Sequence, residues 1–115
     1  MAKIFSLFPT PVYYEREIIN KEDNDFIVEC CYKIQKAAKR GGMGWHTNVY
    51  NTLGTHDVTY DNNFKKLNMS VQEHINKFCK VNGSNHHYNL DNGWVNIYNK
   101  NDYQEYHWHT KATFS

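Results

Sequence analysis

The stretch that decides the fold is residues 93–109, with the sequence GWVNIYNKNDYQEYHWH. Aromatic and β-branched side chains fill residues 94–98, which predicts a strand. Residues 99–102 are rich in types that tolerate left-handed backbone, so they predict a turn. Residues 103–109 predict a second strand, and the whole stretch therefore favours a β-hairpin.

The second strand of this hairpin carries the residues with the clearest chemical potential. Alternate side chains share one face of a strand, so Glu105, His107 and His109 are expected on the same side. Positions i and i+2 lie roughly 6.6 Å apart, which lets two imidazoles lean onto one transition metal ion. Glu105 is about 13 Å from His109 by the same rise, so a third ligand is expected from elsewhere. Most histidines bind no metal, and a solvated or hydrogen-bonded pair is the commoner explanation of this spacing.

The other histidines give weaker signals. His46 and His56 have no partner at ligand spacing in the sequence. His74 lies beside the apolar stripe of a predicted helix and is expected to be packed or at the surface. His86 and His87 are adjacent in a polar loop, where neighbouring side chains point apart. We therefore expect no functional role for these five.

An amphipathic helix is the clearest element of the first half. Asn20 is a suitable N-cap, and apolar residues recur at three- and four-residue spacing over residues 26–38. Lys39 and Arg40 fall in the expected last turn, and the glycines at 41–42 end the pattern.

A second helix and two short strands complete the expected elements. The second helix is predicted to begin at Asp61 or Asn62 and to end at Gly83. The strands are predicted over residues 3–8 and 12–18, the latter with one buried face that carries Val12, Tyr14 and Ile18. They are separated by prolines, which forbid a helix between them.

The amino-acid composition excludes several classes of protein. The chain has 115 residues, 40% of them hydrophobic, and a formal net charge of +1. This predicts one domain, 1–115, with no charge footprint for nucleic acid. The cysteines Cys30, Cys31 and Cys79 form no CxxC pair or disulfide framework. No apolar run approaches the ~20 residues that cross a bilayer. We therefore expect a cytoplasmic, reduced protein without a membrane partner.

Short motifs along the whole chain fall in the order and spacing of a known family. They are residues 7–12 (LFPTPV), 44–45 (GW), 93–97 (GWVNI) and 107–109 (HWH), with a closing FS at 114–115. On these motifs the chain resembles a family of 2-oxoglutarate- and Fe(II)-dependent oxygenases. That family is common in marine bacteria and their phages and is similar to the prolyl hydroxylases; a phage-encoded member would act in the host cytoplasm.

The resemblance implies an α+β fold, the N-terminal part of a double-stranded β-helix (jelly-roll) with two helices packed on one sheet. In such enzymes a His-x-carboxylate pair and a distal His hold the iron. 2-Oxoglutarate chelates the iron and is anchored by a basic residue. His107 matches the first His of the pair. His109 stands where related families place Asp or Glu, so its ligation and the choice of metal stay open.

The resemblance also implies that 1–115 is a single incomplete oxygenase-like domain. In the family, the distal His and the basic anchor follow the HWH motif on further strands, and no Lys or Arg before Ser115 matches the anchor. We therefore expect weak iron binding and an inactive Fe(II)/2-oxoglutarate dioxygenase. An unpaired strand edge favours a homo-oligomer, in which strands are exchanged or a neighbour covers the edge. The substrate class is open among a free amino acid, a peptidyl proline and a nucleobase.

Two alternatives stand beside this interpretation. The first is a non-catalytic β-rich binding or assembly module whose histidines are incidental. The second is a small metal-binding protein of unrelated fold. Iron or nickel bound at His107 would favour the oxygenase over the first alternative.

Overall fold

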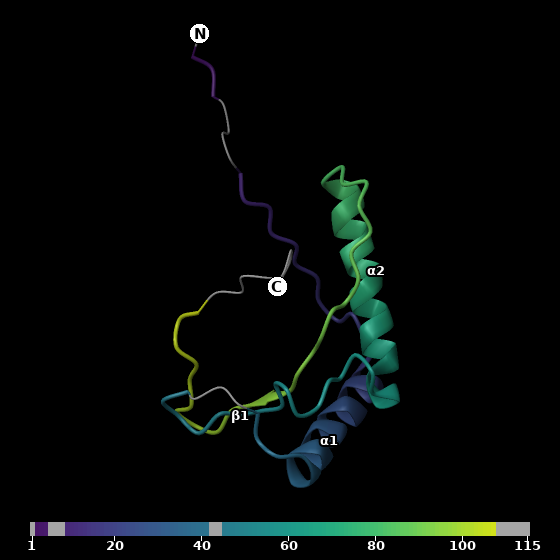
Figure 1. The fold of residues 1–115 in the computed structure, drawn as a ribbon. Helices are drawn as coiled ribbons and strands as arrows, with labels where there is room; N and C mark the ends of the chain where they lie inside the picture. Colours follow the sequence, from purple (N-terminus) through teal and green to yellow (C-terminus); the bar gives the residue numbers. More distant parts are fainter. Residues whose placement is uncertain (1, 5–8, 42–44, 108–115) are drawn as a thin grey trace.

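A computed structural model of the chain describes residues 2–4, 9–41 and 45–107. Its elements, in chain order, are helix α1 (Lys21–Ala37), strand β1 (Tyr50–Asn51), the 3-10 helix η1 (Asn62–Phe64), helix α2 (Lys65–Val81) and strand β2 (Asn96–Ile97). The helices occupy one half of the molecule, and the small sheet and its loops occupy the other (Figure 1).

Helix α1 begins where the sequence predicts. The Asn20 side chain accepts a hydrogen bond from the Asp23 amide at 2.8 Å, as an N-cap does. The buried face of the helix carries Ile27, Cys30 and Ile34, which follow the predicted three- and four-residue spacing. The N-cap and the buried stripe are thus confirmed.

The end of α1 differs from the prediction. The helix ends at Ala37, before Lys39 and Arg40, because Ala38 is extended (φ −105°, ψ 142°). The Tyr50 hydroxyl donates to the Ala38 carbonyl at 3.0 Å, and burial raises the pKa of this phenol. A side chain from β1 therefore satisfies a carbonyl that a longer helix would have used. Periodicity within the helix could not reveal this contact.

The second helical segment follows the prediction closely. The Asp61 side chain accepts from the Asn63 amide at 2.9 Å and caps η1, which runs directly into α2. Gly83 has a φ of 68°, the left-handed conformation that glycine supplies after a helix. Its amide donates to the Lys80 carbonyl at 3.2 Å. The predicted start and end of this helix are confirmed.

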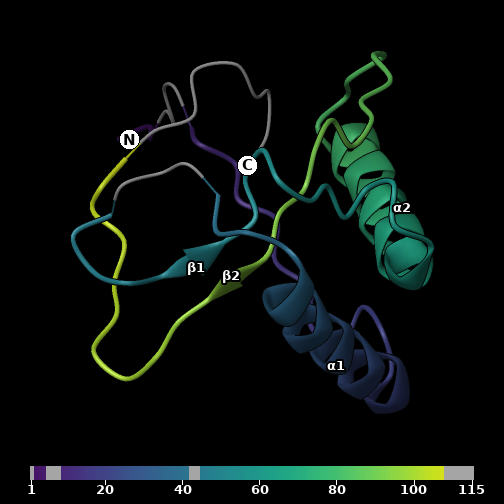
Figure 2. The same cartoon turned by 60° about the horizontal axis from the view of Figure 1, so that its bottom comes forward.

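The predicted hairpin is wrong in its pairing. β2 lies within the predicted strand 94–98, but it pairs antiparallel with β1, 45 residues earlier (96 − 51), and not with the described part of the segment that follows it, residues 98–107. Tyr50 is opposite Ile97 in this ladder. Figure 2 shows the two strands side by side. Long-range pairing of this kind leaves no local signature in the sequence.

The turn after β2 is confirmed, but the strand after it is not. The Asp102 amide donates to the Asn99 carbonyl at 3.0 Å, and Asn101 has a φ of 72°. Residues 102–107 then form no strand. Instead, the Thr47 side chain holds them: its hydroxyl donates to the Tyr103 carbonyl at 2.8 Å. The rest of the predicted strand, 108–109, lies outside the described residues.

The N-terminal segment also departs from the prediction. Among its described residues, 2–4 and 9–17, none lies in a strand. Val12 and Tyr14, which were expected on a buried face, are 84% and 73% exposed. The segment extends away from the helices in Figure 1. The chain's radius of gyration is 17.4 Å, above the ~13 Å expected for a compact domain of this length.

The core lies where α1, η1 and the residue before β2 meet. Its buried members are Ile27, Cys30, Ile34, Phe64 and Val95. Helices α1 and α2 are both joined to η1 by packing contacts. Within the part of the chain that the structure describes, neither helix has the length and apolar character needed to span a membrane. The jelly-roll stays a prediction, since two paired residues per strand do not define such a sheet.

Two phenylalanines provide a test of this core. Phe64 is 2% exposed and Phe26, on α1, is 46% exposed. Phe64→Ala should lower the free energy of unfolding by about 3–5 kcal/mol, because it removes a buried ring and leaves a cavity. Phe26→Ala, the matched control, should cost no more than about 1 kcal/mol. Urea unfolding followed by circular dichroism measures both, and equal losses would contradict the placement of the core.

Candidate functional site

The segment after the turn lies against the segment before β1. The Tyr103 amide donates to the Thr47 hydroxyl at 3.0 Å, and that hydroxyl donates to the Tyr103 carbonyl at 2.8 Å. Both ribbon views place the two segments side by side (Figures 1 and 2). This contact brings together four side chains, Trp45, His46, Glu105 and His107, which we call the Glu105 cluster.

Glu105 is held by His46 through one carboxylate oxygen. Its Oε1 accepts from the His46 backbone amide at 2.7 Å and also contacts the His46 Nδ1. The hydrogen bond from this amide, above all, holds the pKa of the Glu105 carboxyl below its ordinary value. The carboxylate is therefore ionised at neutral pH. Its second oxygen, Oε2, is buried without a hydrogen-bond partner among the described residues.

His107, a predicted metal ligand, is exposed and lies on Trp45. The two ring centroids are 5.1 Å apart, with the planes tilted by 55°. The His107 Nδ1 is 2.9 Å from the carbonyl oxygen of Glu105. If Nδ1 carries the proton and donates to that carbonyl, Nε2 is the nitrogen whose lone pair can bind a metal. The Trp45 indole Nε1 is a further buried atom without a hydrogen-bond partner among the described residues.

The second predicted ligand, His109, lies outside the described residues. Within the described part of the chain, no three His, Cys, Asp or Glu side chains are grouped to hold a metal ion. The structure brings the Glu105 carboxylate to His46, and the His107 ring to Trp45 and to the backbone carbonyl of Glu105. Sequence reasoning placed Glu105 on the same face as His107 but gave no role to His46. The 59 residues between His46 and Glu105 explain the omission, since spacing within one element cannot detect such a pair.

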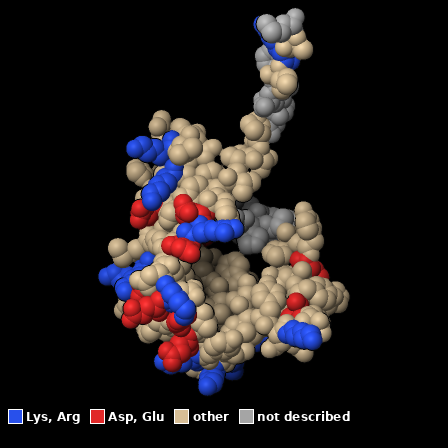
Figure 3. Space-filling model, turned by 180° about the vertical axis from the view of Figure 1, so that it is seen from behind, with Lys and Arg blue, Asp and Glu red and all other residues tan. Residues whose placement is uncertain are grey.

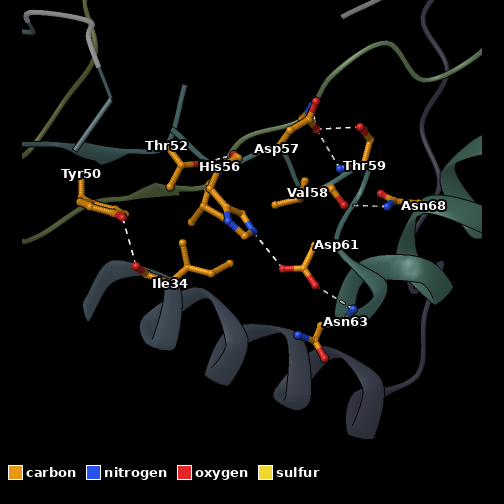
Figure 4. Close-up of polar contacts among 12 residues, drawn as sticks. Ile34, Tyr50, Thr52, His56, Asp57, Val58, Thr59, Asp61, Asn63 and Asn68 are labelled. Atoms are coloured by element: carbon orange, nitrogen blue, oxygen red, sulfur yellow. Dashed lines mark hydrogen bonds and ion pairs between the residues drawn. The ribbon is translucent and has the colours of Figure 1, made fainter. Parts of the chain in front are cut away.

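A second polar cluster surrounds the loop after β1 (Figure 4). The His56 ring points toward Asp61, with Nε2 and Oδ2 2.9 Å apart. Thr52, which is fully buried, donates its hydroxyl to the His56 carbonyl at 2.9 Å. The same hydroxyl accepts from the Val95 amide at 3.0 Å. These bonds tie the loop to η1 and to the chain entering β2.

Asp57 anchors the same loop. Its Oδ1 accepts from the Thr59 amide at 2.9 Å, the Thr59 hydroxyl at 2.7 Å and the Gly93 amide at 3.1 Å. Burial raises the pKa of this carboxyl, but these hydrogen bonds and the nearby His56 outweigh burial and bring it below the ordinary value. A cleft of about 310 Å³, lined by residues 52–57 and 92–94, lies beside it.

The two clusters differ in how completely their polar atoms are satisfied. Three buried side-chain nitrogen or oxygen atoms lack a hydrogen-bond partner among the described residues, namely Trp45 Nε1, Asn51 Nδ2 and Glu105 Oε2. Two of them belong to the Glu105 cluster, and none belongs to the residues around Asp57. Buried atoms of this kind are rare, and an ordered water, an ion, strain or a functional role commonly accounts for them. We therefore take the Glu105 cluster as the candidate site and the Asp57 cluster as structural.

The surface charge favours no extended anionic partner on the face in Figure 3. Lysine, arginine and acidic side chains are intermixed over the helical part, and few lie around the hollow beside it. On helices α1 and α2, the ion pairs Lys66–Asp23, at 2.6 Å, and Lys77–Glu73, at 2.8 Å, neutralise charges locally. A nucleic-acid surface would need a basic patch instead.

Comparison of the chain with protein-family models, with curated proteins and with solved structures gave no match.

The Asp57 anchor predicts a specific dependence of stability on pH. Because its folded-state pKa is lowered, Asp57 contributes stability above the ordinary Asp pKa of about 3.9, and loses it as pH falls through the folded value. Asp57→Asn should therefore lower the free energy of unfolding by about 1 kcal/mol at pH 7. The difference from the unmodified chain should shrink below about pH 4.

Urea unfolding over a pH series, down to the lowest pH at which both proteins fold, measures this difference. The matched control is Asp91→Asn, an exposed residue, which should leave stability unchanged at every pH. A difference for Asp57→Asn that stays constant with pH would contradict the role assigned to its charge.

Proposed function

We propose that this chain is a domain of an Fe(II)- and 2-oxoglutarate-dependent dioxygenase that hydroxylates its substrate, with His107 and His109 as metal ligands. The observation that carries the proposal is the setting of His107. Its ring lies on Trp45, and its Nδ1 is within hydrogen-bond distance of the Glu105 carbonyl. Metal-binding histidines are oriented in this way by an oxygen acceptor on the other ring nitrogen.

The donor atoms of the site suit the proposed metal. Imidazole and carboxylate are the ligand types that non-haem Fe(II) oxygenases use. The Glu105 cluster holds an imidazole and an ionised carboxylate with a buried, unpartnered oxygen, so its chemistry fits a divalent cation. When bound, iron with 2-oxoglutarate would supply the oxidising chemistry of hydroxylation.

Residues of this chain would bind and orient the metal, the cofactor and the substrate. Trp45 contacts the His107 ring, with the planes tilted by 55°, and would limit its rotation. The Trp45 indole N–H is a buried donor available to an oxygen of a cofactor or substrate. The substrate is proposed to be a small molecule or a peptidyl side chain.

We further propose a cytoplasmic location and a homo-oligomer. The described cysteines, Cys30, Cys31 and Cys79, are all free thiols, as is usual in a reducing compartment. Both strands of the two-stranded sheet have an unpaired edge among the described residues. Such edges accept a strand from another copy of the chain.

One observation favours the alternative of a non-catalytic binding or assembly module. Ile4, Val12 and Tyr14 are 95%, 84% and 73% exposed on a segment that extends from the rest of the chain (Figure 1). Apolar residues exposed along an extended segment suit contact with a partner surface. In this alternative the histidines would have no part in function.

Metal titration separates the two functions. Ni(II), or Fe(II) without oxygen, should bind the unmodified chain in isothermal titration calorimetry. His107→Ala and His109→Ala should each weaken binding at least about tenfold, because each removes a proposed ligand. His87→Ala, an exposed histidine in a polar loop, is the control and should bind as the unmodified chain does. Equal affinity for His107→Ala and the unmodified chain would favour the module.

A further inference from the structure

We propose that the N-terminal arm of this chain, residues 9–16, is exchanged between two copies, so that Tyr13 of each copy docks on helix α2 of the other. The exchange gives the proposed homo-oligomer a specific interface, and in this respect the inference rests on the proposed function. It involves neither the metal chemistry nor the edges of the sheet. The face of α2 that receives the arm carries Ser70, His74 and Phe78.

Tyr13 docks the arm on α2 through a polar and an aromatic contact. Its hydroxyl is 2.5 Å from Nδ1 of His74. Its ring meets that of Phe78 edge-on, with the centroids 5.7 Å apart and the planes at 60°, an arrangement that aromatic pairs prefer. His74 and Phe78 are four residues apart and therefore share one face of the helix. Helix α2 thus has a surface that fits this tyrosine, whichever copy supplies it.

The connection between the arm and helix α1 is strained when the arm docks on its own chain. The Ser70 hydroxyl donates to the Ile18 carbonyl at 2.6 Å, so the chain is already fixed to α2 shortly before α1 begins. Between Ile18 and Tyr13, Glu17 has a φ of 54°. This left-handed conformation costs free energy for a residue with a Cβ atom. A short, strained hinge favours the exchange of a segment between copies, because another hinge conformation relieves the strain.

The arm also carries apolar side chains that its own chain leaves uncovered. Val12 and Tyr14, on either side of the docked tyrosine, are 84% and 73% exposed, and all of residues 9–17 are exposed. The segment projects from the rest of the molecule (Figures 1 and 3). An exchanged arm lies against a second molecule, whose surface can cover such side chains. Because each copy gives one arm and receives one, the assembly closes at two copies.

Substitutions at the hinge should shift dimerisation in opposite directions. Glu17→Gly adopts the left-handed conformation without strain, which favours the arm on its own chain, and should weaken the dimer at least about tenfold. Glu17→Pro holds φ at about −65°, which excludes the closed hinge, and should strengthen the dimer to a similar extent. The control Glu15→Gly adds backbone freedom at a residue of the arm without a positive φ and should change the dimer little.

Size-exclusion chromatography with light scattering measures these dissociation constants. The concentration series should reach about 1 mM, because a short flexible linker gives its own segment an effective concentration of that order. The unmodified chain should pass from monomer to dimer within the series.

Mixing two defective variants distinguishes an exchanged arm from any other dimer. Tyr13→Ala has a defective arm and an intact α2, whereas Phe78→Ala has an intact arm and a defective α2. Neither variant can form the Tyr13 contact within one chain or with its own copies. A mixed dimer contains one intact arm on one intact α2, so it should bind about threefold or more tighter than either variant binds itself, an effect within the reach of one aromatic pair.

Fluorescence anisotropy measures this gain, with labelled Tyr13→Ala titrated with unlabelled Tyr13→Ala or with the α2 variant. Circular dichroism shows whether Phe78→Ala is folded, and His74→Ala, which removes the polar contact instead, takes its place if it is not.

The outcomes separate the exchange from the homo-oligomer proposed above. A tighter mixed dimer, with opposite effects of the two Glu17 variants, supports the exchange. No gain on mixing overturns it; if the unmodified chain still dimerises, the homo-oligomer stands and forms through the sheet edges or another surface. If the unmodified chain stays monomeric throughout the concentration series, both proposals fail.

Discussion

The pairing of Thr52 with Val95 joins the two halves of the chain. Thr52 is fully buried, and its amide donates to the Val95 carbonyl at 3.1 Å while its hydroxyl accepts from the Val95 amide at 3.0 Å. Buried polar groups must find partners, since an unmade bond costs about 1–3 kcal/mol. Val95 also packs in the core with α1 and η1. The contact between Thr52 and Val95 therefore fixes the register of the sheet and also packs the sheet against the helices.

The candidate site follows from that register. With Asn51 opposite Asn96, the chain leaving β2 turns back and meets Thr47, which holds Tyr103 through both of its backbone groups. Only then does Glu105 reach His46. The pairing of β1 with β2, which lies outside the site, thus determines where the two segments of the site meet.

The carboxylates of Asp57 and Glu105 differ in how their oxygen atoms are hydrogen-bonded. The Oδ1 of Asp57 accepts three hydrogen bonds from Thr59 and Gly93, and its charge stabilises the fold. Glu105 also has its donors on one oxygen, but its other oxygen is buried and has no hydrogen-bond partner among the described residues. A protein tolerates such a half-satisfied group where binding completes it. This contrast is the reason to look for function at Glu105 and for stability at Asp57.

The sequence by itself determined the two helices, their caps at Asn20 and Gly83 and the turn at residues 99–102, because these depend on hydrogen bonds and side-chain spacing within one element. It also marked His107 as a candidate. The tertiary structure decided the partner of β2, the early end of α1 under Tyr50 and the meeting of His46 with Glu105. These contacts join residues far apart in the chain, whose pairing depends on the packing of the whole core and leaves no periodic pattern in the sequence.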